Sequence, residues 1–170
     1  MLIPTDIAHQ ILATFGITKP TPAYDRWMRD DGVLLDDFDE ILFASPFIFS
    51  ADWRDALHDA IPPIVAALQL LDVDLSVELV GEDGTDATVS HNGKSTLLRY
   101  ETNDDGDFNA VIQSLQSLLT TPVSFRASPS NDGSDTLNFA VLPDDEWAEL
   151  DSIAPDVIRH FFAPLSQNRG

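Results

Sequence analysis

The sequence predicts an α+β fold: a single domain with a mostly antiparallel sheet and helices packed on one face of it. Three patterns predict this class. Apolar and polar residues alternate over residues 73–80, which is the two-residue period of a half-buried strand. Apolar residues recur at helical spacing over residues 108–119. Further strand patterns, each bounded by turn residues, predict a three-strand meander before this helix and a two-strand hairpin after it.

The N-terminal residues predict an extra helical segment. In residues 4–16, four apolar side chains fall on one helical face; Thr5 or Asp6 is the expected cap, and Gly16 is the expected end. The closely spaced prolines that follow indicate a connection, with a turn of helix over residues 24–29. Residues 33–49 suit a strand or a buried loop equally well, and we expect a short strand over residues 41–43.

A longer helix is expected over residues 50–71. Ser50 is its expected N-cap, and Asp52 lies in the first turn, where a negative charge complements the helix dipole. Pro62 and Pro63 cannot donate the hydrogen bonds of a helix interior. We therefore expect the helix to kink or restart at these two residues.

The meander is expected next, with strands over residues 73–80, 85–90 and 95–101. Asn92-Gly93 predicts a type I′ turn between the last two of these strands. After the helix over residues 108–119, a second hairpin is expected from residues 122–127 and 136–142, joined by a polar loop.

Two short helices are expected near the C-terminal end. Pro143 with Asp144 predicts the start of the first, and Pro155 with Asp156 predicts the start of the second. Their expected inward-facing residues are Trp147, Leu150, Val157, Ile158, Phe161 and Phe162.

The chain of 170 residues suits one domain. We expect an N-terminal helix and an acidic, aromatic connection over residues 1–50. An α-β-β-β-α-β-β-α core is expected over residues 51–170.

Composition excludes several functional classes. Acidic residues outnumber basic ones 29 to 9, giving a formal net charge of -20. Because nucleic acids and anionic membranes attract basic surfaces, we expect neither as a direct ligand. The chain has no cysteine, which excludes disulfides, thiolate metal sites and a cysteine nucleophile. It also lacks a signal-peptide pattern and a long apolar run, so we expect a soluble, cytoplasmic protein.

The stretch "RYETNDDGDFNAVI" was compared with the calcium-loop pattern. With Gly106 at the invariant glycine, Glu101 and Asp105 fall on ligand positions, but Ile112 occupies the position of the essential bidentate carboxylate. We interpret the stretch as a strand end, a turn and a helix whose cap is Asp107. Weak cation binding by residues 101–107 stays open.

No catalytic signature is present. The four histidines have no metal-ligand spacing, "HNGKS" lacks the first glycine of a phosphate-binding loop, and no serine lies in a nucleophile motif. His58 lies near Asp55 and Asp59 on one expected helix, which we interpret as a solvated helix face. We expect no catalytic residue, no cofactor and no metal.

The acidic excess is concentrated in one segment. Nine acids lie at or just before expected helix starts, where they stabilise helix dipoles. The remaining acids are densest in "RDDGVLLDDFDE", where they are interleaved with apolar residues. Charge would steer a basic partner to such a surface, and apolar anchors would supply affinity. The candidate partner-binding residues are Trp27, Asp30, Asp31, Asp36, Asp37, Phe38, Asp39 and Glu40.

These features favour a non-enzymatic acidic binding protein that inhibits or holds a basic protein, as an immunity protein inhibits a bacterial toxin. A second hypothesis rests on element order. From residue 50 onward, the expected order is helix, three strands, helix, two strands and helix. This order resembles the order of elements in type III secretion chaperones. That resemblance implies a homodimer that holds an effector segment. A small enzyme and an acidic protein adapted to high salt also stay open, the latter because the only lysines are Lys19 and Lys94.

Overall fold

The computed structural model describes residues 1–52, 54–81, 86–100, 108–132 and 134–165. The N-terminal elements are β1 (Leu2–Ile3), α1 (Thr5–Thr14), α2 (Pro22–Trp27), β2 (Val33–Leu34), α3 (Leu35–Leu42) and β3 (Ile48–Asp52). The central elements are α4 (Leu57–Leu70), β4 (Ser76–Val80), β5 (Asp86–His91), β6 (Lys94–Arg99) and α5 (Phe108–Leu118). The C-terminal elements are β7 (Val123–Ala127), a short 3₁₀ turn η1 (Pro129–Asn131), β8 (Thr136–Pro143), α6 (Asp144–Ile153), α7 (Pro155–Phe161) and β9 (Ala163–Pro164).

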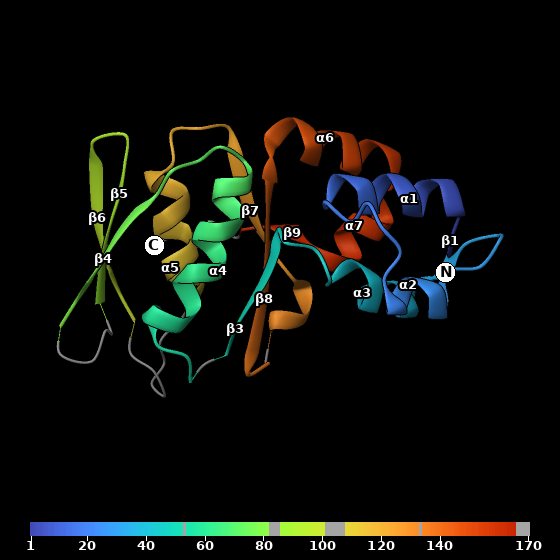
Figure 1. Ribbon diagram of the computed structural model, residues 1–170, viewed down its shortest axis with the longest axis horizontal. Coiled ribbons are helices and arrows are strands. Elements are labelled where there is room, and N and C mark those ends of the chain that lie inside the picture. The colour runs from blue at the N-terminus through green and yellow to red at the C-terminus, as the bar shows by residue number, and fades with distance from the viewer. Residues whose placement is uncertain (53, 82–85, 101–107, 133, 166–170) are drawn as a thin grey trace.

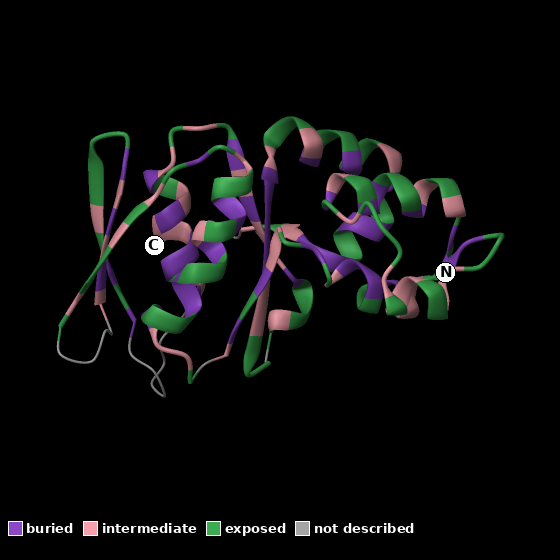
Figure 2. Ribbon diagram, in the orientation of Figure 1, coloured by how far each residue is buried: buried purple, intermediate pink, exposed green. Residues whose placement is uncertain are grey.

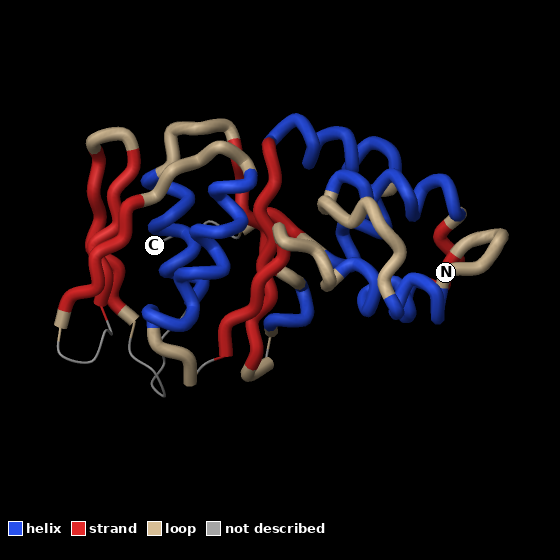
Figure 3. The backbone as a smooth tube through the Cα atoms, in the orientation of Figure 1, coloured by secondary structure: helices blue, strands red, loops and turns tan. Residues whose placement is uncertain are grey.

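The elements form alternating layers of sheet and helix (Figure 1). A three-stranded sheet of order β4-β5-β6 lies at one end, and a four-stranded sheet of order β3-β8-β7-β9 lies in the middle. Helices α4 and α5 fill the space between the two sheets, and the other helices cover the far face of the middle sheet (Figure 3). All the described strand pairs are antiparallel, which confirms the α+β prediction.

The middle sheet is covered by helices on both faces, whereas we expected helices on one face. The sequence of β8 explains this difference. Phe139 and Val141 point into the core between the two sheets, and Ala140 and Leu142 point into a second core beneath the N-terminal and C-terminal helices. All four residues are completely buried (Figure 2). A continuous apolar run of this kind is typical of a strand with two buried faces.

The first core is built largely by α4 and α5. Helix α5 begins at Phe108 and buries Phe108, Val111, Ile112, Leu115 and Leu118, which confirms the helical pattern read from the sequence. The meander packs on the same core through Ala87, Val89 and Leu98. At the turn between β5 and β6, Asn92 and Gly93 have φ of 49° and 79°, as a type I′ turn requires.

The expected strand over residues 41–43 is wrong. Ile41 and Leu42 belong to α3 and lie three and four residues after Phe38, so the three side chains share one buried helical face. The strand in this region is β3. It starts at Ile48, which pairs with Ala140 of β8.

The expected start of the next helix is also wrong. Ser50 lies inside β3, where its hydroxyl donates a hydrogen bond to Asn138 Oδ1 at 2.6 Å instead of capping a helix. Helix α4 begins at Leu57 and continues through Pro62 and Pro63 without a restart. Both prolines are exposed, so water can bond to the carbonyl groups that lose their helical donors.

Prolines mark the starts of α1, α6 and α7. Pro4 is the N-cap of α1, and neither Thr5 nor Asp6 caps it through a side chain. The starts of α6 and α7 lie where Pro143 and Pro155 predicted them. Among the described residues, no helix combines the length and the apolar character that crossing a membrane requires.

Candidate functional site

The acidic segment lies at the N-terminal end of the molecule, on the turn after α2 and on α3. Asp30 and Asp31 are at the tip of a tight turn that is closed by hydrogen bonds in both directions between the backbones of Arg29 and Gly32, at 2.9 and 3.2 Å. The hydroxyl of Thr5 donates to the carbonyl of Asp30 at 3.0 Å, which anchors the turn to α1. The turn therefore presents two carboxylates on a fixed backbone.

Helix α3 presents the other carboxylates. Asp36 and Asp37 lie in its first turn, where they stabilise the helix dipole, and Asp39 and Glu40 follow in the next turn. Asp39 Oδ1 accepts a hydrogen bond from the backbone N–H of Glu40 at 2.6 Å. Asp36, Asp39 and Glu40 are exposed, and Asp37 is half-buried.

Trp27 and Glu40 have a structural role in addition to the expected binding role. The indole Nε1 of Trp27 donates a hydrogen bond to Glu40 Oε2 at 2.8 Å, and Arg26 Nη1 lies 3.6 Å from the same oxygen. These contacts fasten α2 to α3. Glu40 is therefore partly neutralised, and Trp27 is half-buried rather than free.

Phe38 does not reach the surface, contrary to its expected role as an exposed anchor. It is completely buried in the second core, where its ring centroid lies 6.0 Å from that of Phe161. The large apolar residues that are exposed here are Met1, Leu2 and Leu34, at 61%, 47% and 55%. Leu2 and Leu34 are direct cross-strand partners in the small β1-β2 sheet. Sequence reasoning missed this pair because the pairing of two-residue strands far apart in the chain has no local signature.

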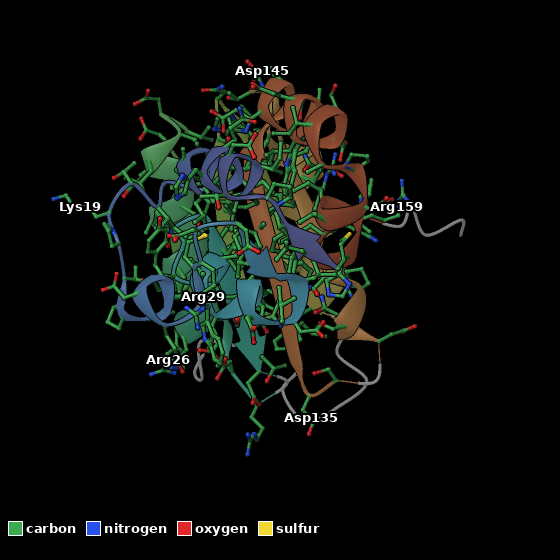
Figure 4. The ribbon with its side chains drawn as sticks, turned by 90° about the vertical axis from the view of Figure 1, so that its right-hand side faces the viewer. Lys19, Arg26, Arg29, Asp135, Asp145 and Arg159 are labelled. Atoms are coloured by element: carbon green, nitrogen blue, oxygen red, sulfur yellow. The ribbon has the colours of Figure 1, made fainter. Side chains whose placement is uncertain are left out.

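We define the acidic surface as Asp30, Asp31, Asp36, Asp37 and Asp39 together with Leu2 and Leu34. Within the part of the chain that the structure describes, none of these five carboxylates forms an ion pair. Figure 4 views the molecule from this end and shows Arg26 and Arg29 on one side, with Lys19 and Arg159 at opposite margins. Arg29 Nη1 donates to the carbonyls of Arg26 and Met28, at 2.7 and 3.2 Å, and to no carboxylate of the described residues.

A cavity of about 770 Å³ lies elsewhere, between α5, β7 and α6. Its charged groups have hydrogen-bond partners within the protein. Arg126 holds both oxygens of Asp151 at 2.8 and 2.6 Å, and its guanidinium lies 4.2 Å from the centroid of the Trp147 ring. The hydrogen bonds from Arg126 lower the pKa of Asp151. Ser124 donates a short hydrogen bond to Asp144.

Gln116 lines this cavity and bonds to the edge of β7. Its side-chain amide donates to the carbonyl of Val123 at 2.9 Å and accepts from the N–H of Phe125 at 2.7 Å. It thereby occupies the edge of β7 as a neighbouring strand would. Every polar group named here has a partner within the protein. We therefore interpret these side chains as structural contacts that hold α5, β7 and α6 together.

The histidines lie on separate elements. His9 contacts Tyr24 Oη at 2.6 Å, His58 lies 3.2 Å from Asp59, His91 contacts the carbonyl of Asp74 at 2.8 Å, and the His160 ring packs edge-on against Phe161. Among the described residues, no group of three or more His, Asp or Glu side chains is arranged to hold a metal. Residues 101–107, with the calcium-loop comparison and the Asp107 cap, lie outside the described residues. "HNGKS" lies in the β5-β6 turn, outside any strand–loop–helix context.

Comparisons of the chain with protein-family models, curated proteins and solved structures give no match.

Proposed function

We propose that the protein is a non-enzymatic acidic binding protein whose acidic surface docks on a basic protein, most simply a bacterial toxin that it inhibits. One observation carries the proposal. The acidic surface combines five carboxylates that lack ion pairs among the described residues with two exposed leucines. Strand pairing between β1 and β2 holds the backbone of the two leucines in place. Helix-dipole stabilisation accounts for Asp36 and Asp37 but not for Asp30, Asp31 and Asp39.

The two kinds of residue act at different stages of binding. The carboxylates attract a basic partner over a distance of about one Debye length, roughly 8 Å at physiological salt, and raise the association rate. Leu2 and Leu34 supply affinity after contact, because burying the exposed half of each leucine contributes about 1 kcal/mol. A basic groove that normally binds phosphates would be blocked by the carboxylates of the turn and α3.

The rigidity of the acidic surface supports a binding role. The turn that carries Asp30 is held by Thr5, and α3 is held to α2 through Trp27 and Glu40. A surface that is already ordered loses little conformational entropy when it binds.

A chaperone-like function is the second candidate. The observation in its favour is the order α4, β4-β5-β6, α5, β7-β8, α6, which is the order expected from the resemblance to type III secretion chaperones. A chaperone of this kind would hold an extended segment of an effector. An inhibitor would instead form a one-to-one complex with a folded basic protein.

The proposal is tested with a panel of purified small basic nucleases as probes. The wild-type chain is expected to inhibit at least one of them with one-to-one stoichiometry, and the association rate is expected to fall steeply as salt rises. The variant Asp30→Asn/Asp31→Asn/Asp36→Asn/Asp39→Asn should lose most of this inhibition. A matched variant, Asp74→Asn/Asp132→Asn/Asp145→Asn/Glu149→Gln, removes the same number of exposed charges elsewhere and should retain it. Binding that ignores salt, or equal losses in both variants, would contradict the proposal.

A further inference from the structure

The strand β6 has an open edge. In the sheet of order β4-β5-β6, one side of β6 pairs with β5, and no strand among the described residues pairs with its other side. An open edge presents a row of backbone N–H and C=O groups that can pair with a strand of another chain. Leu97, in the middle of this edge, is 45% exposed.

The turn between β5 and β6 determines which residues of β6 face the open side. In a two-residue hairpin the pair that closes the turn, here His91 and Lys94, is hydrogen-bonded, and the bonding alternates along the strands from there. Every second residue from Ser95 onward therefore directs its backbone N–H and C=O away from β5. Leu97 is the central one of these residues.

The face around β6 is the least acidic part of the described molecule. Residues 87–100 and 108–131, which supply β6, α5 and β7, contain no Asp or Glu, although the whole chain has a formal net charge of -20. The four acids of residues 101–107 lie outside the described residues. Because a second copy carries the same negative charge, two copies meet less repulsion from the described residues of this face than from those of the acidic surface.

The opposite edge of the same sheet differs in charge. Strand β4 also has an open side among the described residues, and Leu79 is 48% exposed on it. Strand β4 carries Glu78, and Asp72 and Asp74 precede the strand. Pairing of two copies through β4 would therefore bring like charges together, which disfavours it.

The edge of β6 also has space beside it. A cavity of about 710 Å³ lies between β6 and α5, lined on the helix by Ala110, Gln113, Ser114, Ser117 and Leu118. A strand added to β6 would extend the sheet over this part of α5.

We propose that two copies of the chain form a dimer by antiparallel pairing of their β6 strands, with the two-fold axis at Leu97. In this register Leu97 faces Leu97 of the second copy, and Arg99 faces Ser95 of the second copy. No like charges are then directly opposite each other. The two three-stranded sheets become one continuous sheet. The acidic surfaces, which lie at the other end of each chain (Figure 1), point away from the interface.

The dimer is tested by sedimentation of the full chain, with substitutions at the two sheet edges. The wild type should have twice the chain mass of 18.7 kDa at micromolar concentration and above. Leu97→Pro removes an outward-facing N–H, which leaves the hydrogen bonds to β5 intact, and should weaken the dimer about tenfold or more. Leu79→Pro makes the same change at the β4 edge and should leave the dimer unchanged. Circular dichroism establishes that each variant is folded.

A cysteine variant provides a second test that does not depend on tolerance of proline. The chain has no cysteine, so Leu97→Cys introduces a single thiol, which should link two copies at the two-fold axis under mild oxidation. Leu79→Cys should remain largely unlinked. A wild type that is monomeric at all concentrations, or preferential linking at position 79, would overturn the inference. Neither result would bear on nuclease inhibition, so the dimer and the proposed function fail separately.

Discussion

At the scale of single residues, burial separates two roles that the sequence placed in one segment. Phe38 and Leu34 both lie among acids, yet Phe38 is completely buried and Leu34 is 55% exposed. The helical register of α3 turns Phe38 toward Phe161, whereas Leu34 points outward from β2 beside Leu2. The first residue stabilises the fold, and the second is available to a partner.

Substitutions at these two residues should have opposite consequences. Phe38→Ala should lower the free energy of unfolding by about 3–5 kcal/mol, because it leaves a cavity in the second core. Leu34→Ala should change stability by no more than about 0.5 kcal/mol and should weaken partner binding instead. Urea denaturation measures the first effect and nuclease inhibition the second. A large loss of stability in Leu34→Ala would contradict its assignment to the binding surface.

The ion pair between Arg126 and Asp151 should make stability depend on pH. Because the pKa of Asp151 is lowered in the folded protein, its contribution is complete above the ordinary aspartate pKa of about 4 and is lost as pH falls through the lowered value. Asp151→Asn should therefore cost about 1 kcal/mol near neutral pH and almost nothing in strong acid. Glu149→Gln, at an exposed position on the same helix, is the control. Urea denaturation of both variants, near neutral pH and in acid, measures the loss of free energy of unfolding. An equal loss for Asp151→Asn under the two conditions would contradict the predicted pH dependence.

At the scale of elements, the sequence predicted most of the secondary structure but not its layering. The alternation over residues 73–80 and the helical stripe from Phe108 onward depend on local periodicity. The helical stripe was confirmed. The predicted strand forms only over Ser76–Val80, and Leu79, which the alternation placed on the buried face, is 48% exposed. The misassigned strands depend on distant partners. Ser50 looks like a helix cap by itself, but its segment pairs with β8, almost ninety residues later. The division into separate sheets was likewise set by long-range pairing.

The edge of β7 offers a test at this scale. Gln116→Leu should lower the free energy of unfolding by about 1–3 kcal/mol, because the carbonyl of Val123 and the N–H of Phe125 lose their partner. Gln116→Glu keeps the acceptor for Phe125 but sets a carboxylate oxygen against the carbonyl oxygen of Val123, so it should not restore the stability of the wild type. Urea denaturation of the two variants gives the comparison. If Gln116→Leu were as stable as the wild type, the strand-like role of this side chain would be contradicted.

At the scale of the whole molecule, charge is distributed unevenly. The acidic surface lies at one end. The face of β6 and α5, which has no Asp or Glu among its described residues, lies toward the other end. Composition predicted a basic partner, and the local density of acids indicated residues 30–40. What composition could not show is which of these acids the fold uses internally, as it uses Glu40, and which apolar side chains it exposes beside them, as it exposes Leu2.

The most direct test of the central claim is a map of where a short arginine peptide binds, obtained from the amide chemical shifts of the isotope-labelled chain at low salt. The peptide is a defined basic probe that any strongly acidic surface can attract. If the acidic surface is the docking site, the largest shift changes should lie on residues 30–39 and at Leu2 and Leu34. They should disappear in Asp30→Asn/Asp31→Asn/Asp36→Asn/Asp39→Asn and persist in the matched variant. Shift changes spread evenly over all exposed acids, including those of α6, would show that the negative charge is a general surface property and would contradict a dedicated docking site.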